Sequence, residues 1–304
     1  GSGVTILLLS LVLAPKLTES EDLQGAFTST AVVFVVIGFA LYMLCFATAR
    51  ETVVRDVERV SLHQALSTLR QNNALMRLCL SSVLYLTGQS VVSAGALYYA
   101  REVLEDGGLG AIVTIVTTGA VVYVGPFGPR IMSVFGKKRS FIIGGIVAAA
   151  GGLLLLVIPS SNGVGQVVGL GLVGFGMGVL NTMTWAQGAD TVEYGEWKTG
   201  IRAEGATYAA FSFTRKVGQA IGAALFSFAL AAGDYVTTDH AAGAVQPDKA
   251  VDAIRWAMGI LPAGLFLLSV AVMAGYPLTE AAHRSMVDEI RARRAHTGED
   301  THAG

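Results

Sequence analysis

Long apolar segments alternate with short polar ones along most of the chain. Seven segments are about as long as an α-helix must be to cross the hydrocarbon core of a bilayer, which is about 20 residues. They cover about residues 29–48, 77–100, 109–133, 140–158, 164–188, 205–231 and 254–276. An eighth, Val4–Leu13, stops before Pro15 and resembles the second half of such a helix. The pattern predicts an all-α multi-pass membrane protein with about seven full transmembrane helices and one partial helix.

Lysine and arginine are concentrated in every second loop between these segments. One set of loops, together with the C-terminal tail, holds fifteen of the 21 Lys and Arg residues, and the opposite set holds four. Because basic loops usually stay on the cytoplasmic side during insertion, we expect the basic set to be cytoplasmic. The distribution predicts a protein of the plasma (inner) membrane with a cytoplasmic C-terminus and an outer turn at 159–163.

The composition supports a membrane protein and argues against several other classes. Of the 304 residues 53% are hydrophobic and 14% are charged, whereas soluble domains contain about 25% charged residues. The net charge of −1 provides no basic surface for nucleic acid. Cys45 and Cys79 lie in apolar segments, and the five histidines lie in polar ones without the spacing of metal ligands. We therefore expect no disulfide framework and no metal site.

The order of the segments indicates two groups of helices joined by a polar linker. Residues 1–50 would hold the end of a first bundle (a partial helix five and helix six), and residues 51–76 a cytoplasmic middle loop with room for a surface helix. Residues 77–280 would form a six-helix bundle, and 281–304 a cytoplasmic tail. The chain starts Gly-Ser-Gly and its first apolar segment is half a helix, so we expect an N-terminally truncated chain.

Small residues recur at four-residue spacing in two neighbouring segments. Such spacing lets helix backbones approach closely in membranes. The positions are Gly144, Ala148 and Gly152 in one segment, and the pairs Gly165/Gly169 and Gly174/Gly178 in the next. Gly169–Gly174 also matches the dinucleotide motif GxGxxG, but no strand precedes it, so we interpret the glycines as helix contacts. Pro126 and Pro129 predict a break near the end of the segment 109–133, as a passive helix end or a gate.

A polar stripe runs along the segment 205–231. At 100° per residue its members share a sector of about 100°; they are Tyr208, Ser212, Arg215, Lys216 and Gln219. Lys216 would lie about 16 Å into the helix, near the middle of a core about 30 Å thick. A cation there is costly unless it has a partner or a hydrated cavity. The stripe indicates either a buried structural ion pair or a hydrated path for a substrate or ion.

The stretch before this stripe is dense in charges of both signs. It carries Asp190, Glu193, Glu196, Lys198, Arg202 and Glu204 within fifteen residues. We expect a charged cytoplasmic loop beside helix ends, where opposite charges pair across the two bundles. Such pairing would hold the cytoplasmic side closed until the bundles rock.

The segment Ala189–Gly222 resembles the glycoside–pentoside–hexuronide:cation symporters, the melibiose permease-like branch of the major facilitator superfamily. The resemblance rests on D-x-V-E-Y-G-E-W-K-x-G-x-R-x-E-G, followed by small and aromatic residues and then K-x-G. The basic turn Gly136–Arg139 and the order of spans agree with it, although the turn lacks the acidic residue of the superfamily signature. The resemblance implies a major facilitator fold, from the last half of helix five through helix twelve.

The resemblance also implies roles for particular residues. Lys216 would lie close to the sugar and cation sites, and Ser212 would present a hydroxyl to the cavity. The other candidates for substrate binding or coupling are Tyr208, Gln219, Arg215 and Asn181. The candidates for the cytoplasmic gate are Asp190, Glu193, Glu196, Arg202 and Glu204.

Two positions depart from the family pattern. Asn181 stands where the family can place an aromatic residue near the sugar, and Phe211 stands where it can place glutamine. The sugar therefore need not be an α-galactoside. The family also places its cation ligands and its main sugar-binding acids on helices one to four, which this chain does not contain.

Three classes of function are compatible with these features to different degrees. The favoured one is symport of a sugar or glycoside with Na⁺ or H⁺ by alternating access, without any other cofactor. The alternatives are a symporter of another solute, such as a lysophospholipid, and an inactive structural or sensory protein with a transporter fold. We expect no enzyme, because no Asp, Glu or His lies in mid-span to serve as a base or metal ligand.

Overall fold

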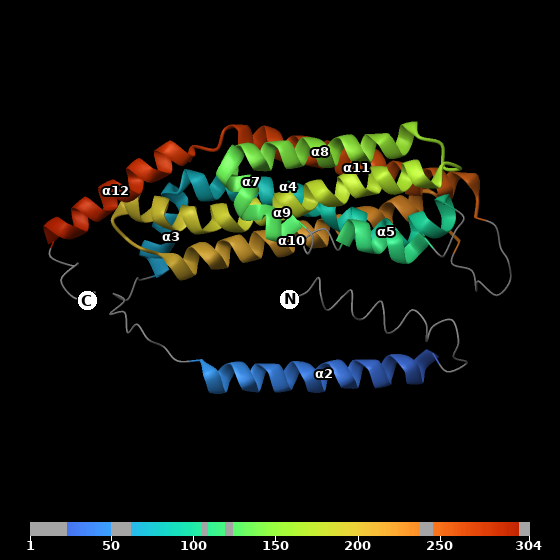
Figure 1. Ribbon diagram of the computed structural model, residues 1–304, viewed down its shortest axis with the longest axis horizontal. Coiled ribbons are helices and arrows are strands. Elements are labelled where there is room, and N and C mark those ends of the chain that lie inside the picture. Colours follow the sequence, from blue (N-terminus) through green and yellow to red (C-terminus); the bar gives the residue numbers. More distant parts are fainter. Residues whose placement is uncertain (1–22, 50–61, 105–108, 119–123, 237–245, 298–304) are drawn as a thin grey trace. The chain divides into compact units, whose positions relative to one another are not determined.

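The computed structural model describes residues 23–49, 62–104, 109–118, 124–236 and 246–297 (Figure 1). The chain divides into two compact units, residues 1–59 and residues 60–304. The described helix of the first unit is α2 (Leu23–Thr48). Val4–Leu13 lies outside the described residues. The predicted domain limits 1–50, 51–76, 77–280 and 281–304 stay predictions.

The described secondary structure of the second unit is entirely helical. Its elements are α3 (Leu62–Gln71), α4 (Asn73–Tyr98), a π-helical turn η1 (Tyr99–Val103), α5 (Leu109–Thr118), a 3-10 turn η2 (Gly125–Phe127), α7 (Gly128–Phe135), α8 (Lys137–Val157), α9 (Gly163–Thr199), α10 (Glu204–Ala232), α11 (Asp248–Ala274) and α12 (Glu280–Thr297). The described residues contain no strand, which agrees with the predicted all-α class.

Five described helices are long and apolar enough to cross a membrane. They are Thr28–Thr48, Asn73–Val103, Lys137–Val157, Gly163–Thr199 and Asp248–Ala274, and each coincides with a predicted segment. α10 covers a sixth predicted segment and is 29 residues long. Its middle carries Arg215, Lys216 and Gln219, so that its central stretch is polar on one face. The fold is therefore that of an all-α multi-pass membrane protein.

The predicted segment 109–133 is interrupted. α5 ends at Thr118, residues 119–123 lie outside the described residues, and the chain then forms the 3-10 turn η2 before α7 begins. Pro126 lies inside η2 and Pro129 in the first turn of α7. Proline has no amide hydrogen to donate to the preceding turn, which explains the break at this place.

The acidic residues Asp190, Glu193 and Glu196 lie in helix α9, so the prediction of a loop after residue 188 is wrong there. α9 continues to Thr199 and ends only at Gly200, whose φ of 72° suits glycine as a helix cap. Its 37 residues would extend about 55 Å, far more than a bilayer core of about 30 Å. The last turns of α9 therefore project beyond the apolar core as a charged extension.

Two helices lie in stretches where the hydropathy pattern shows no span. α3 falls in the predicted middle loop, in agreement with the expected surface helix, and α12 falls in the predicted tail. Asn72 separates α3 from α4. Its side chain caps α4 by accepting a hydrogen bond from the Leu75 amide (2.8 Å) and donates another to the Thr191 carbonyl of α9 (2.7 Å). This contact joins the linker to the extension of α9.

Glycines bring α8 close to two neighbouring helices. A Cβ at Gly144 would lie 2.8 Å from Val179 of α9, and a Cβ at Gly152 would lie 2.8 Å from the Gly259 carbonyl of α11. These positions confirm the predicted close packing of α8. Gly144 allows the close approach of α9, and Gly152 allows that of α11. In Figure 1, α8 runs along both helices.

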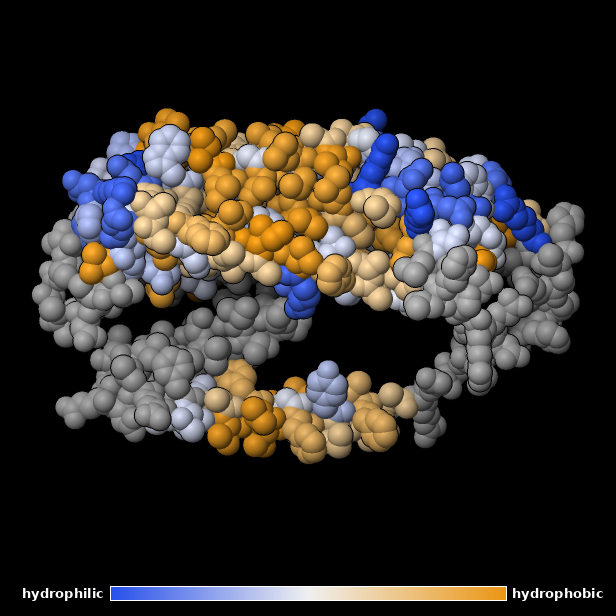
Figure 2. Space-filling view, turned by 180° about the vertical axis from the view of Figure 1, so that it is seen from behind, coloured by the Kyte–Doolittle hydropathy of each residue, from blue (hydrophilic) through white to orange (hydrophobic). Residues whose placement is uncertain are grey.

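α4 packs between α10 and α11. On one side Ser81 and Ser269 of α11 pair through their hydroxyl groups (2.8 Å), and on the other the Thr87 hydroxyl donates to the Gly218 carbonyl of α10 (3.2 Å). Figure 2 shows an apolar band over the middle of the bundle, with hydrophilic side chains gathered mainly toward its two ends. That distribution fits a helix bundle whose middle is surrounded by lipid.

Candidate functional site

Arg215 joins three helices in the middle of the second unit. Its Nη1 donates to the Tyr85 hydroxyl of α4 (2.8 Å), and its Nη2 donates to Asn181 Oδ1 of α9 (3.2 Å). Its guanidinium carbon lies 4.8 Å from the Trp185 ring centre and 5.6 Å from that of Phe211. Two neutral acceptors and two aromatic rings therefore fix this cation, and no carboxylate of the described residues takes part.

The other residues of the polar stripe lie more openly on α10. Lys216 and Ser212 are exposed, while Tyr208 and Gln219 are half-buried. Within the described part of the chain, Lys216 has no hydrogen-bond or ion-pair partner. The neighbouring face of α10, with Phe211 and Gly218, is buried. The structure thus separates two adjacent cations, a fixed Arg215 and an open Lys216.

The sequence comparison with the family missed the aromatic residue of this site. Asn181 stands where the family can place an aromatic residue. Trp185 lies one helical turn later on α9 and is 47% exposed. Its ring is 5.5 Å from that of Phe211, edge to face, and it faces the Arg215 guanidinium. The four-residue spacing from Asn181 was the available signal, because residues i and i+4 share a helix face.

A second group of polar residues, here called the charged-end cluster, consists of Lys137, Asp190, Glu193 and His283. The Lys137 ammonium donates to both carboxylate oxygens of Asp190, each at 2.8 Å, and Asp190 is buried. His283 Nε2 lies 2.7 Å from a Glu193 oxygen and 3.4 Å from Asp190 Oδ1. α8 and α9 therefore meet through an ion pair, and His283 of α12 contacts the same carboxylates.

The contacts of this cluster extend along α12. Trp197 Nε1 donates to Glu289 (2.8 Å), and Arg293 Nη1 donates to the Trp197 carbonyl (3.1 Å). Near the start of α12, Glu280 accepts the Lys137 amide (3.0 Å) and so caps α8. The sequence reasoning missed His283 and Lys137 because each is far from Asp190 along the chain.

Arg202 forms a separate pair of contacts after the end of α9. Its Nη1 donates to Glu196 (2.9 Å), and its Nε lies 3.4 Å from Glu204 at the start of α10. Burial alone would lower the pKa of Arg202, but these two carboxylates outweigh it and raise that pKa above its usual range. Thus the five predicted gate residues form two sets, and all contacts described for them lie within the second unit.

Tyr276 lies beside the charged-end cluster. Its side chain is buried, and within the described residues its hydroxyl has no hydrogen-bond partner. Burial, helped by the nearby charge of Asp190 and by Tyr194, raises the pKa of Tyr276 well above its usual range. This phenol is therefore neutral at every physiological pH.

The charged-end cluster also has the donor atoms of a metal site. Single ligand atoms of Asp190, Glu193 and His283 lie within 4.8 Å of one another. The Lys137 ammonium already pairs with Asp190, which is one of these three residues. The absence of a metal site stays a prediction.

Comparison with known proteins gives a single family. The family model for MFS/sugar transport proteins matches residues 1–280. A glucuronide carrier protein homolog of Escherichia coli (strain K12) is 36% identical over 96% of this chain and 64% of its own length. A putative 2,3-dihydroxypropane-1-sulfonate exporter of Salmonella typhimurium is 30% identical over 97% of this chain and 64% of its own.

A third relative extends the range of solutes. An isoprimeverose transporter of Lactiplantibacillus pentosus is 29% identical over 85% of this chain and 53% of its own length. The chain thus spans slightly less than two thirds of the length of the first two relatives and about half of the third. The match with the family model ends at Glu280, the first residue of α12.

Proposed function

Since this chain belongs to the family of MFS/sugar transport proteins, we propose that the protein is a secondary active transporter that moves a sugar-like solute in symport with a cation across the plasma membrane. Transporters of this class expose a site near the bilayer midplane alternately to each side. The Arg215 site is our candidate for this position, because Lys216 lies about 18 Å along α10 from its first residue.

The observation that carries the finer proposal is the charge of this site. Arg215 and Lys216 lie at mid-helix, and no aspartate or glutamate lies in the middle of any described spanning helix. Two cations at this depth are costly unless each has a partner or a hydrated cavity, and Lys216 has no partner among the described residues. We propose that the solute supplies that partner, and that it is a sugar carrying a carboxylate or sulfonate group.

The names of two relatives support an anionic solute. A glucuronide carries a carboxylate, and 2,3-dihydroxypropane-1-sulfonate carries a sulfonate. Isoprimeverose, in the name of the third relative, is a neutral sugar, so family membership alone does not select an anion. The selection rests on the two cations of α10.

The proposed roles follow from how each residue is held. Tyr85 and Asn181 hold Arg215 in place, so it supplies a fixed positive field and a donor edge. Lys216 is exposed and unpaired among the described residues, so it makes the direct contact with the anionic group. Trp185 offers an exposed aromatic face, against which the C–H face of a sugar ring can pack.

The coupling cation needs ligands of the opposite sign. Carboxylate oxygens are the usual ligands for a hard cation and can also exchange a proton at suitable pKa. Because the described spanning helices carry no carboxylate at mid-depth, we propose that other parts of the transporter bind Na⁺ or H⁺. The charged-end cluster would act at the inner gate, a role that the resemblance implies for its members Asp190 and Glu193.

Uptake assays test the choice of an anionic solute. Proteoliposomes that contain the whole transporter, with an imposed ion gradient and membrane potential, would be given a radiolabelled aryl glucuronide or the matching neutral glucoside. We expect faster uptake of the glucuronide. Lys216→Gln should lower it by one to two orders of magnitude, because a charge-assisted contact worth about 2 kcal/mol is lost.

Two variants make the result specific. Lys216→Arg keeps the charge and should retain a substantial part of the uptake, and Lys198→Gln removes an exposed cation outside the site and should change little. Equal uptake of glucuronide and glucoside by the unsubstituted protein would contradict the anionic solute. If Lys216→Gln leaves the gradient-driven uptake of a transported solute unchanged, that result would contradict the proposed site.

A further inference from the structure

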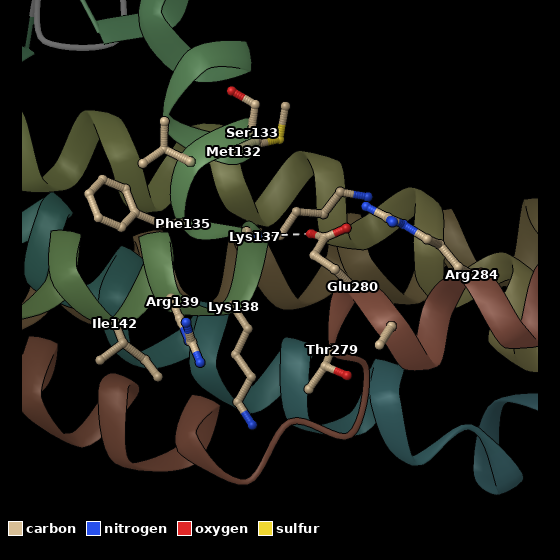
Figure 3. A pocket seen from close by; sticks show the side chains of 13 residues that line it. Met132, Ser133, Phe135, Lys137, Lys138, Arg139, Ile142, Thr279, Glu280 and Arg284 are labelled. Carbon is tan, nitrogen blue, oxygen red and sulfur yellow. Dashed lines mark hydrogen bonds between the residues drawn. The ribbon is translucent and has the colours of Figure 1, made fainter.

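A cavity of about 800 Å³ lies at the charged end of the second unit, away from the Arg215 site. The turn between α7 and α8 forms one wall, and the start of α12 forms the other (Figure 3). Four cationic side chains line it, namely Lys137, Lys138, Arg139 and Arg284. Glu280 is the one acidic side chain in this lining. The cavity therefore has an excess of positive charge.

The four cations differ in their partners. Lys137 is paired with Asp190, and the Lys138 ammonium donates to the Tyr276 carbonyl (2.8 Å). Arg139 and Arg284 are exposed, and no ion pair joins either of them to another described residue. Glu280 directs one oxygen to the Lys137 amide. Two guanidinium groups, one from α8 and one from α12, thus remain available to an anion.

The same cavity has an apolar side. Phe135 and Ile142 line it opposite Glu280 and Arg284 in Figure 3. Val134, also in the lining, is 72% exposed, and Phe135 is 50% exposed. α8, which begins at Lys137, is one of the helices apolar enough to span a membrane. The cavity consequently lies where the apolar surface of the bundle meets its charged end.

We propose that this cavity binds the phosphate headgroup of an anionic phospholipid. A phosphate presents several acceptor oxygens and a full charge, which suits two forked guanidinium groups. Basic pockets at the ends of transmembrane helices recognise anionic headgroups in this way. A free phosphate would satisfy the charges but leave Val134 and Phe135 uncovered, whereas the acyl chains of a lipid cover them.

Such a lipid would connect α12 to the spanning part of the protein. Arg139 lies in the first turn of α8 and Arg284 in the second turn of α12. A single headgroup between them would add a bridge to those made by Lys137, Glu280 and His283. α12 would then be held partly by the membrane itself.

Native mass spectrometry of the purified protein tests this site, with phosphatidylglycerol and phosphatidylethanolamine of identical acyl chains as probes. We expect retained phosphatidylglycerol to exceed phosphatidylethanolamine. Arg139→Gln/Arg284→Gln should weaken the retention of phosphatidylglycerol by about tenfold to thirtyfold, as expected for the loss of two cations near a headgroup. The control Lys249→Gln/Arg291→Gln removes two other exposed cations and should keep the preference.

Further measurements distinguish a lipid from free phosphate as the source of the anion, and single variants control for misfolding. Inorganic phosphate in millimolar excess should not displace phosphatidylglycerol, and displacement would overturn the lipid as occupant. Equal retention of the two lipids by the unsubstituted protein, or an unchanged preference in the double variant, would also overturn it. If the double variant does not fold, the single variants Arg139→Gln and Arg284→Gln decide, each with a smaller expected loss.

Discussion

Arg215 and Lys216 are adjacent on α10 but differ in their contacts. They are separated by about 100° around α10, so Arg215 meets α4 and α9 while Lys216 faces outward. The first cation has four neighbours that fix its position, and the second has none among the described residues. In the proposed site, a fixed cation and an open one would provide a positive field before a solute arrives.

Two buried tyrosines allow the contribution of the Arg215 contact to be measured. Tyr85→Phe removes an acceptor from a charged donor in a buried site, and we expect it to lower the free energy of unfolding by about 1–3 kcal/mol. Tyr276→Phe removes a hydroxyl that has no partner among the described residues, and we expect no loss. Thermal unfolding in detergent would compare the two variants.

Tyr276 also predicts a loss of stability at alkaline pH. Because the pKa of Tyr276 is raised in the folded protein, its phenol keeps its proton there after the unfolded phenol, with a pKa of about 10, has lost it. Below pH 10 the phenol is neutral in both states and does not affect the free energy of unfolding, whereas above pH 10 deprotonation of the unfolded phenol favours the unfolded chain, so that stability decreases as the pH rises. Tyr276→Phe should remove this part of the alkaline loss. A variant as sensitive to pH as the unsubstituted protein would contradict the assignment.

At the scale of elements, hydropathy predicted helices where burial in lipid requires them. The segments 29–48, 77–100, 140–158, 164–188 and 254–276 each coincide with an apolar helix, because apolar side chains and length decide that outcome. Hydropathy failed beyond residue 188 and in the tail. There the helices α9 and α12 are charged, and helix propensity, the cap at Gly200 and contacts between them decide the structure.

The attachment of α12 gives the prediction at this scale. His283→Ala removes the contacts of α12 with Glu193 and Asp190, while Trp197–Glu289 and Lys137–Glu280 remain. We expect amide hydrogen exchange in α12 to become about fivefold faster, which corresponds to about 1 kcal/mol. α8 should exchange as before.

Arg291→Ala is a suitable control for this measurement. Arg291 lies on the same helix, its side chain is 75% exposed, and its described contact is a 3.9 Å approach to Asp288. An exposed pair at this distance contributes little to stability. Equal acceleration by His283→Ala and Arg291→Ala would mean that the charged-end cluster does not hold α12.

At the scale of the whole molecule, the sequence identified the charged residues of the candidate sites more readily than the residues that contact them. The polar stripe of α10 could be recognised from helical periodicity alone, since its residues belong to one helix. Tyr85 and Trp185 could not be recognised in this way, because each comes from another helix and looks like an ordinary aromatic residue of a span. His283 and Lys137 were hidden for the same reason. Local patterns identify a face, and only tertiary packing shows what meets it.

The distribution of charge also predicts the orientation of the whole molecule in the membrane. With fifteen Lys and Arg residues in one set of loops and the tail, against four in the other, we expect the charged-end cluster to be cytoplasmic. Single cysteines can report this in a protein without Cys45 and Cys79. Ser161→Cys, in the exposed turn between α8 and α9, should react with a membrane-impermeant maleimide in intact cells. Lys198→Cys, exposed near the end of α9, should react only after permeabilisation. The reverse pattern would place the charged-end cluster outside the cell and exclude it as an inner gate.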